Sequence, residues 1–285
     1  MPTVLTVGSL HYDIMVEADH LPRRDETAIG SRWYPKFGGK GGNQAVAVAR
    51  AGGASRMVGA VGDDGFGDYL RAHLRKAGVQ DQFVVTVPGM GSGMSVAIQD
   101  HAGDYAATIV SGANLMISID TLTGPDLWEG TSLLVLQNEV PQAVNLAAAI
   151  TARARGIPTL LNAAPYRPLP AQMAGLVDLL VVNAVEAEMM GAGPVDDLAS
   201  AGIAAQHLAG QYRTVIVTAG GDGLAACGVD QVLFLLPADK VQVVSSHGAG
   251  DSFIGTLATR LAEGRDLQTA CRDASRAAAR HVAGS

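Results

Sequence analysis

Residues 246–251, Ser-His-Gly-Ala-Gly-Asp, place a glycine-rich turn and a carboxylate directly before an apolar helical face. That face predicts a helix over 251–262 and is formed by Phe253, Ile254, Leu257, Ala258, Leu261 and Ala262. The free N–H groups and the dipole at the start of such a helix suit a phosphate or a developing negative charge. Asp251 could accept the proton of a hydroxyl that attacks a phosphoryl group, although aspartate at a helix start is also typical of an ordinary N-cap.

A second glycine loop, FGGKGGNQA, spans residues 37–45 and also leads into a predicted helix. Four glycines around Lys40 let the backbone approach a ligand closely, and the Asn43 amide can both donate and accept hydrogen bonds to sugar hydroxyls. The alternative is a flexible turn with a solvated lysine. Neither loop has the spacing of a P-loop, and the absence of a strict G-x-G-x-x-G weakens a dinucleotide-binding interpretation.

Three shorter features follow predicted strands. Asn183 and Glu186 share a helical face and could address phosphate and hydrated Mg²⁺, although their spacing alone favours a capping box. Residues 218–223, TAGGDG, could hold a nucleotide against the backbone or form a plain turn. Asp13 and Glu139 could hold sugar hydroxyls, whereas a single carboxylate is more often a surface group.

The elements that must position these residues follow an alternating pattern. Strands are predicted at 4–7, 57–61, 133–136, 159–161, 179–182 and 215–217, and helices at 43–51, 66–76, 143–155, 184–190, 197–208, 251–262 and 267–282. This rhythm predicts βαβ units and a mostly parallel sheet, at whose carboxyl edge the glycine loops should meet. Two hairpins are also predicted: one over 93–110 that turns at 100–104, and one over 223–236.

Part of the chain does not fit this rhythm. Exposed strands near 27–37 and 93–110 predict a small β appendage over one edge of the main sheet, and lid strands are expected from about 11–37 and 90–110. No linker or repeat divides the chain, so residues 1–285 are expected to form a single domain.

Composition and charge exclude some classes of protein. With 20 basic and 27 acidic residues, a net charge of −7 and no basic stripe, the chain is not expected to bind nucleic acid. No apolar run approaches the roughly 18 residues of a membrane span, and the N-terminus lacks the pattern of a signal peptide. A cytoplasmic protein is therefore expected.

Together these motifs resemble the ribokinase family of carbohydrate kinases. GGKGGNQA and GAGDSF are similar to its N-terminal and C-terminal signatures; the N-x-x-E at 183–186, the T-x-G-x-x-G at 218–223 and the SGAN at 111–114 occur in the family's order. The resemblance implies a three-layer α/β/α sheet with a β-sheet lid that often forms a homodimer. It also implies ATP, Mg²⁺ and transfer of the γ-phosphoryl group to a primary hydroxyl.

The resemblance assigns roles to individual residues. Asp251 becomes the base and the backbone of Gly248, Ala249 and Gly250 becomes the anion hole. The sugar contacts become Asp13, Gly39, Lys40, Asn43 and Glu139, with His11 at the place of a further contact. The nucleotide site becomes Asn183, Thr218, Gly220, Gly223 and Ser275, and Glu186 acts on Mg²⁺ through water.

The chain also departs from the family. His11 stands where ribokinases typically have an asparagine that contacts the sugar, and Ser245 stands where they usually have an aspartate beside a K⁺ ion. The tail segment that supplies carbonyls to K⁺ is not present in this sequence, so activity without K⁺ is expected. D-Ribose is the lead substrate. The alternatives are another sugar, a nucleoside, or a non-catalytic protein of the same fold that binds nucleotide and sugar; an NAD-type oxidoreductase fits the rhythm but lacks the fingerprint.

Overall fold

The computed structural model describes residues 1–101, 105–228 and 232–284. The large sheet contains β1 (Thr3–Val7), β4 (Ala54–Gly62), β5 (Gln80–Val87), β8 (Thr131–Gln137), β9 (Thr159–Asn162), β10 (Leu179–Asn183), β11 (Val215–Thr218), β12 (Gly223–Cys227) and β13 (Leu233–Pro237). The small sheet contains β2 (His11–Ala18), β3 (Gly30–Gly38), β6 (Met94–Asp100) and β7 (Tyr105–Val110). The helices are α1 (Lys40–Arg50), α2 (Gly65–Lys76), α3 (Pro125–Trp128), α4 (Gln142–Ala154), α5 (Ala171–Ala174), α6 (Ala184–Met189), α7 (Leu198–Leu208), α8 (Ala249–Ala262) and α9 (Leu267–Val282), with short 3₁₀ turns η1 (Gly112–Met116), η2 (Ile119–Leu122) and η3 (Gly220–Asp222).

The large sheet has the order β13-β12-β11-β10-β9-β8-β1-β4-β5. Its strands are parallel from β11 to β5, and β12 and β13 add an antiparallel edge. The predicted parallel sheet and its 223–236 hairpin are confirmed, although residues 229–231 lie outside the described part. Strand β5 was not predicted, because its first residues, Gln80-Asp81-Gln82, resemble an exposed loop when read alone.

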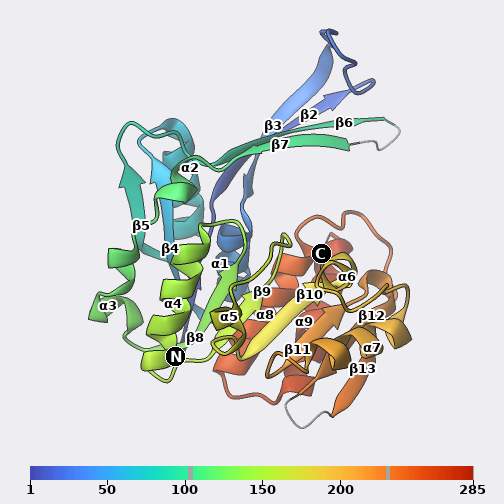
Figure 1. Ribbon diagram of the computed structural model, residues 1–285. Helices are drawn as coiled ribbons and strands as arrows, with labels where there is room; N and C mark the ends of the chain where they lie inside the picture. The colour runs from blue at the N-terminus through green and yellow to red at the C-terminus, as the bar shows by residue number, and fades with distance from the viewer. Residues whose placement is uncertain (102–104, 229–231, 285) are drawn as a thin grey trace.

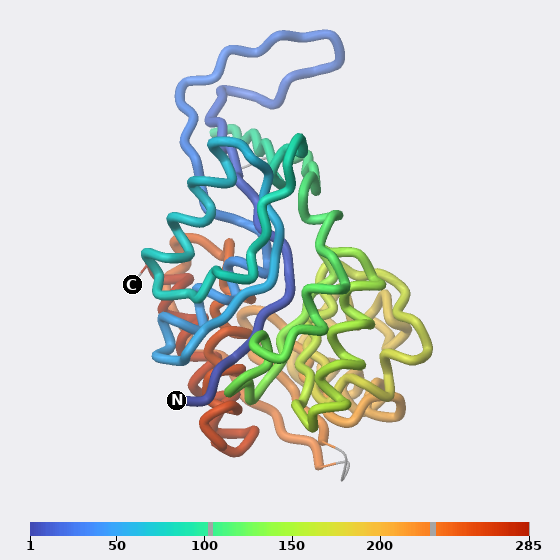
Figure 2. Tube along the Cα trace, turned by 90° about the vertical axis from the view of Figure 1, so that its left-hand side faces the viewer, coloured from blue at the N-terminus to red at the C-terminus, as the bar shows by residue number. Residues whose placement is uncertain are grey.

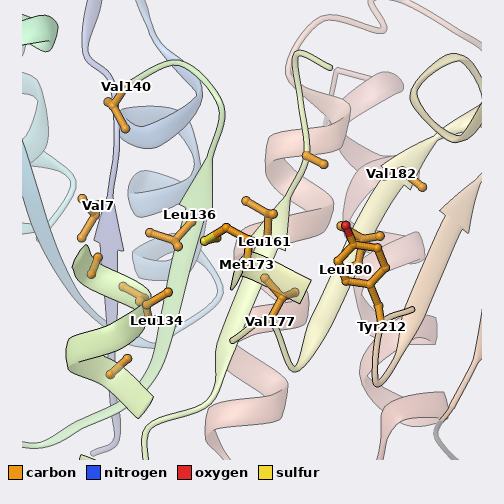
Figure 3. Close-up of a cluster of buried hydrophobic side chains, with 14 of the residues drawn as sticks. Val7, Leu134, Leu136, Val140, Leu161, Met173, Val177, Leu180, Val182 and Tyr212 are labelled. Atoms are coloured by element: carbon orange, nitrogen blue, oxygen red, sulfur yellow. The ribbon is translucent and has the colours of Figure 1, made fainter. Parts of the chain in front are cut away.

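Helices cover both faces of the sheet because successive side chains along each strand point to opposite sides. Leu134, Leu136 and Leu180 pack with helices α4, α5 and α7 on one face (Figure 3). Leu133, Val135 and Val181 pack with α8 and α9 on the other, where α1 also lies. The three-layer α/β/α architecture is thus confirmed.

The small sheet, called the lid below, has the order β3-β2-β6-β7 and extends away from the main body (Figure 1 and Figure 2). The predicted pairing of 93–99 with 105–110 is present as antiparallel β6 and β7, while residues 102–104 of its turn lie outside the described part. At the root of the lid, Tyr12 stacks on Phe66 with ring centroids 4.0 Å apart, and Phe37 stacks on His73 at 4.2 Å. These contacts hold the first residues of β2 and the last residues of β3 against α2.

Candidate active site

Asp251 lies in the first turn of α8, but it is not the N-cap. The helix begins two residues earlier than predicted, and its N-cap is Gly248, which has the left-handed φ of 84° that favours glycine. The Asp251 side chain is only 8% exposed and accepts hydrogen bonds from Asn43 Nδ2 at 3.1 Å and Gln44 Nε2 at 2.9 Å. The ordinary N-cap interpretation of this aspartate is therefore wrong.

The surroundings of Asp251 act on its charge in opposite directions. Burial raises the pKa of the carboxyl group, while the Lys40 ammonium and the hydrogen bonds from Gln44 and Asn43 lower it. Glu139 adds a smaller upward effect. The net effect is a raised pKa, with burial as the largest cause. The two N–H donors that face the carboxyl oxygens oppose this rise and so favour the ionised form, which a general base requires.

The turn before α8 presents N–H groups next to this carboxylate. The Ala249 N–H makes a long bond of 3.3 Å to the Ser246 carbonyl. In the described part of the chain, the N–H groups of Gly248 and Gly250 have no such partner. They lie at the positive end of a 14-residue helix, where an anion is favoured.

The predicted nucleotide residues come together at one cavity of about 780 Å³. Its lining includes Asn183, Glu186, Thr218, Gly220, Gly223 and Ser275, and it also includes Lys40 and residues 248–251. Lys40, which the resemblance assigns to the sugar, therefore faces the nucleotide cavity as well. These residues come from five separate segments of the chain that the fold brings together.

Asn183 and Glu186 form the capping box that their spacing favours. Asn183 Oδ1 accepts from the Glu186 N–H at 2.8 Å, and Glu186 Oε2 accepts from the Asn183 N–H at 2.9 Å. Both residues also line the nucleotide cavity, so the structural and the binding interpretations are compatible. Among the described residues there is no cluster of three His, Cys, Asp or Glu side chains that could hold a metal ion.

The predicted sugar residues lie at the base of the lid. Asp13, on β2, is buried and accepts a hydrogen bond of 2.5 Å from Ser95 Oγ, and burial raises its pKa. His11 is 4% exposed, and within the described residues its Nε2 has no hydrogen-bond partner. Glu139 accepts from Ser9 Oγ at 2.5 Å and from the Lys40 N–H at 2.8 Å, so it also fixes the start of α1.

The start of α1 requires glycine for two reasons. Gly39 is its N-cap with a φ of 85°, and an added Cβ would lie 2.8 Å from the backbone of Ser9. An added Cβ at Gly41 would lie 2.5 Å from the same segment. The backbone of α1 thus closely approaches the segment after β1, whereas the sequence predicted its close approach to a ligand.

A second cavity of about 590 Å³ also has Asp251 in its lining. Asn43, Lys36 and His247 line it, while Gly248 and Asp251 line both cavities. His11, Asp13, Gly39 and Glu139 are not among the described residues that line either cavity. The catalytic candidate thus lines both cavities, while three of the six sugar candidates, His11, Asp13 and Gly39, are buried.

Comparison with known proteins identifies a family over nearly the whole chain. Residues 1–284 match the pfkB family carbohydrate kinase model. The chain is 32% identical over 284 residues to the ribokinase of Bacillus subtilis (strain 168), covering 99% of this chain and 93% of that protein. It is also 32% identical over 285 residues to the deoxyribokinase of Salmonella typhimurium, covering 99% and 92%.

Solved structures agree. The structure of Arabidopsis thaliana ribokinase complexed with ribose and ATP superimposes with a TM-score of 0.91 at 27% identity, covering 99% of this chain and 92% of that one. In the described part of this chain, no helix is long and apolar enough to cross a membrane. The family match covers residues 1–284, and it agrees with the motifs, the three-layer fold and the buried Asp251 beside a glycine loop. This chain therefore belongs to the pfkB family and is an ATP-using carbohydrate kinase.

Proposed function

We propose that this enzyme transfers the γ-phosphoryl group of ATP to the hydroxymethyl group of a small sugar, with D-ribose as the lead substrate. The observation that carries the proposal is the position of Asp251, which is buried at the meeting of two cavities between paired amide donors and the turn before α8. The ribokinase names of the relatives support ribose.

In the proposed reaction, the bond that forms is matched by a bond that breaks. The sugar hydroxyl oxygen forms a bond to the γ-phosphorus, the bond between that phosphorus and the bridging oxygen of ADP breaks, and the hydroxyl proton passes to Asp251. Lys40 and the N–H groups of Gly248 and Gly250 stabilise negative charge on the transferring group. Asp13 and Asn43 hold the sugar so that its hydroxyl faces the phosphorus.

Mg²⁺ would contribute charge neutralisation on the phosphates, and Glu186, which lines the 780 Å³ cavity together with Asp239 and Asp251, is the carboxylate proposed to act on it through water. A carboxylate that acts through water suits an ion that keeps most of its water and is held mainly by the nucleotide. We expect Glu186→Gln to raise the Mg²⁺ concentration needed for half-maximal activity about tenfold. Glutamine can keep the capping box. Glu188→Gln, an exposed change on the same helix, is the control, and equal Mg²⁺ curves for both variants would contradict the assignment.

The identity of the sugar requires a direct experiment. D-Ribose, 2-deoxy-D-ribose, other sugars and nucleosides would be compared by ADP formation, and the phosphorylated position would be read by ³¹P–¹H NMR. The largest kcat/KM is expected for D-ribose on its hydroxymethyl group. A clear preference for deoxyribose, another sugar or a nucleoside would replace ribose, and binding of ATP and sugar without turnover would indicate a non-catalytic protein.

K⁺ is proposed to be dispensable, because the backbone before α8 is already bonded within the protein. His281 Nε2 lies 2.9 Å from the His247 carbonyl and must donate, since a carbonyl only accepts. The Val282 carbonyl accepts from the N–H groups of Val244 and Ser245 at 2.8 and 3.2 Å. At fixed ionic strength, exchange of K⁺ for a large organic cation is expected to change turnover by less than about twofold. Activation of tenfold or more by K⁺ would show that a cation site is present.

A homodimer through the lid is the proposed assembly. Strand β7 is exposed along its whole length, and Trp33, Tyr105 and Ile109 are 62%, 58% and 58% exposed. Apolar side chains concentrated on one sheet are typical of a protein interface.

A further inference from the structure

Gln44 directly contacts the candidate base, although the sequence interpretation gave it no role. It lies on α1, is 0% exposed, and donates through Nε2 to Asp251 Oδ1, while its neighbour Asn43 donates to Oδ2. The motif GGKGGNQA contained Gln44, but its spacing alone does not show that the side chain points at another helix. Two consecutive amides thus hold the two oxygens of one carboxylate.

The packing of α1 against α8 explains how this contact arises. An added Cβ at Gly255 would lie 2.4 Å from the Ala47 Cβ, so the two helices are in close contact at this point. One turn earlier on α8 is Asp251, and one turn earlier on α1 are Asn43 and Gln44. The glycine therefore lets the amides reach the carboxylate.

Packing alone does not account for an amide at position 44. Within the described residues, Gln44 Oε1 is buried and has no hydrogen-bond partner. A methionine or leucine would fill similar space without leaving a buried oxygen unpaired. If the amide were turned over, that oxygen would face the Asp251 carboxylate, so only the donating orientation suits an ionised base.

We propose that Gln44 is a positioning residue that holds Asp251 in its ionised form and aims its free lone pairs at the substrate hydroxyl. This inference rests on the proposed role of Asp251 as the base. Asn43 has a second amide hydrogen and a carbonyl oxygen with which to bind sugar. Gln44 is fully buried, and in the described part of the chain its side chain bonds to the carboxylate alone.

The groups around Asp251 predict the direction in which the pH profile should move when Gln44 is replaced. Burial raises the pKa of Asp251, and the Lys40 charge and the bonds from Gln44 and Asn43 work against that rise; Glu139 adds to it. The 590 Å³ cavity beside Asp251 is also lined by other titratable or charged groups: Lys36, Arg50, His73, His247, Arg260, Arg280 and His281. Without the Gln44 hydrogen bond, less opposes the effect of burial, so the pKa of Asp251 rises further. The acid limb of the activity profile then moves to higher pH.

The test is the pH profile of kcat in Gln44→Met and Gln44→Glu. We expect Gln44→Met to lower kcat at pH 7 about tenfold or more, with partial recovery at higher pH and an unchanged KM for ATP. Gln44→Glu should move the acid limb further, because two carboxyl groups then share one site. Ser55→Ala is the matched control, since Ser55 Oγ donates to the Ala45 carbonyl of the same helix without touching Asp251. It should leave the profile in place.

The outcomes distinguish the role of Gln44 from the role of Asp251 as the base. A folded Gln44→Met enzyme with a wild-type kcat and pH profile would overturn the role of Gln44, even if Asp251→Asn is inactive. If Asp251→Asn keeps its turnover, the base assignment itself fails. Should Gln44→Met not fold, Gln44→Asn keeps the amide but withdraws it by one methylene. The same upward shift is expected there, and an unshifted profile would overturn the proposal.

Discussion

Asp251→Asn is expected to lower kcat by about a hundredfold or more while the affinity for ATP changes little. Asparagine keeps the shape of the side chain and can still accept from one of its two amide donors, but it cannot take a proton from the sugar hydroxyl. The cavity proposed for ATP is lined mainly by other segments, so nucleotide binding should survive. Steady-state kinetics for kcat and calorimetry for ATP affinity are the measurements.

Loss of folding can be separated from loss of the base. Because burial raises the pKa of Asp251, the contribution of this group to stability is present at low pH and lost as the pH rises through the folded-state pKa. Above that pKa the fold carries the cost of a buried charge, which asparagine does not have. The melting temperature of Asp251→Asn at pH 8 should therefore equal or exceed that of the wild type. Near-normal turnover in this folded variant would exclude the mechanism.

Asp13→Ala is expected to raise the KM for the sugar about tenfold to a hundredfold. A sugar hydroxyl that loses a buried acceptor is left unpaired, at a cost of about 1–3 kcal/mol. ATP affinity measured without sugar should stay the same, because Asp13 is not among the described residues lining the nucleotide cavity. Sugar affinity is also expected to weaken as the pH falls, since burial raises the pKa of Asp13 and the protonated form is a poorer acceptor.

The control for this variant is Asp19→Ala, just after β2, where the carboxylate is 81% exposed and pairs with His101. It should leave both substrates unaffected. Equal losses of ATP and sugar affinity in a folded Asp13→Ala enzyme would move Asp13 out of the sugar subsite. Asn43→Ala would not test the sugar subsite by itself. Asn43 also donates to Asp251, so its loss should lower turnover as well.

Local sequence patterns were sufficient to predict those features that depend on neighbouring residues in the chain. Alternating apolar runs and helical periodicity predicted the parallel sheet and most of its helices, since burial on two faces leaves a direct trace in the residue order. Strand β5 escaped prediction because an edge strand with polar residues at its start has no such trace. The glycine loops were also visible, because positive φ and close backbone approach restrict the residue type.

The sequence by itself determined which chemistry was available: a carboxylate and free N–H groups at a helix start, a lysine among glycines, and an order of motifs resembling one kinase family. The tertiary structure alone decided how these parts act on one another. Asp251 turned out to be held by two amides 207 and 208 positions away in the chain, instead of capping its own helix. Asp13 and Glu139, which read singly as surface carboxylates, are both engaged in hydrogen bonds beside the site. The physical reason is that the pKa and orientation of a group depend on what packs around it, and the close contact at Gly255 that brings Gln44 to Asp251 joins residues too distant in the chain for any spacing to reveal.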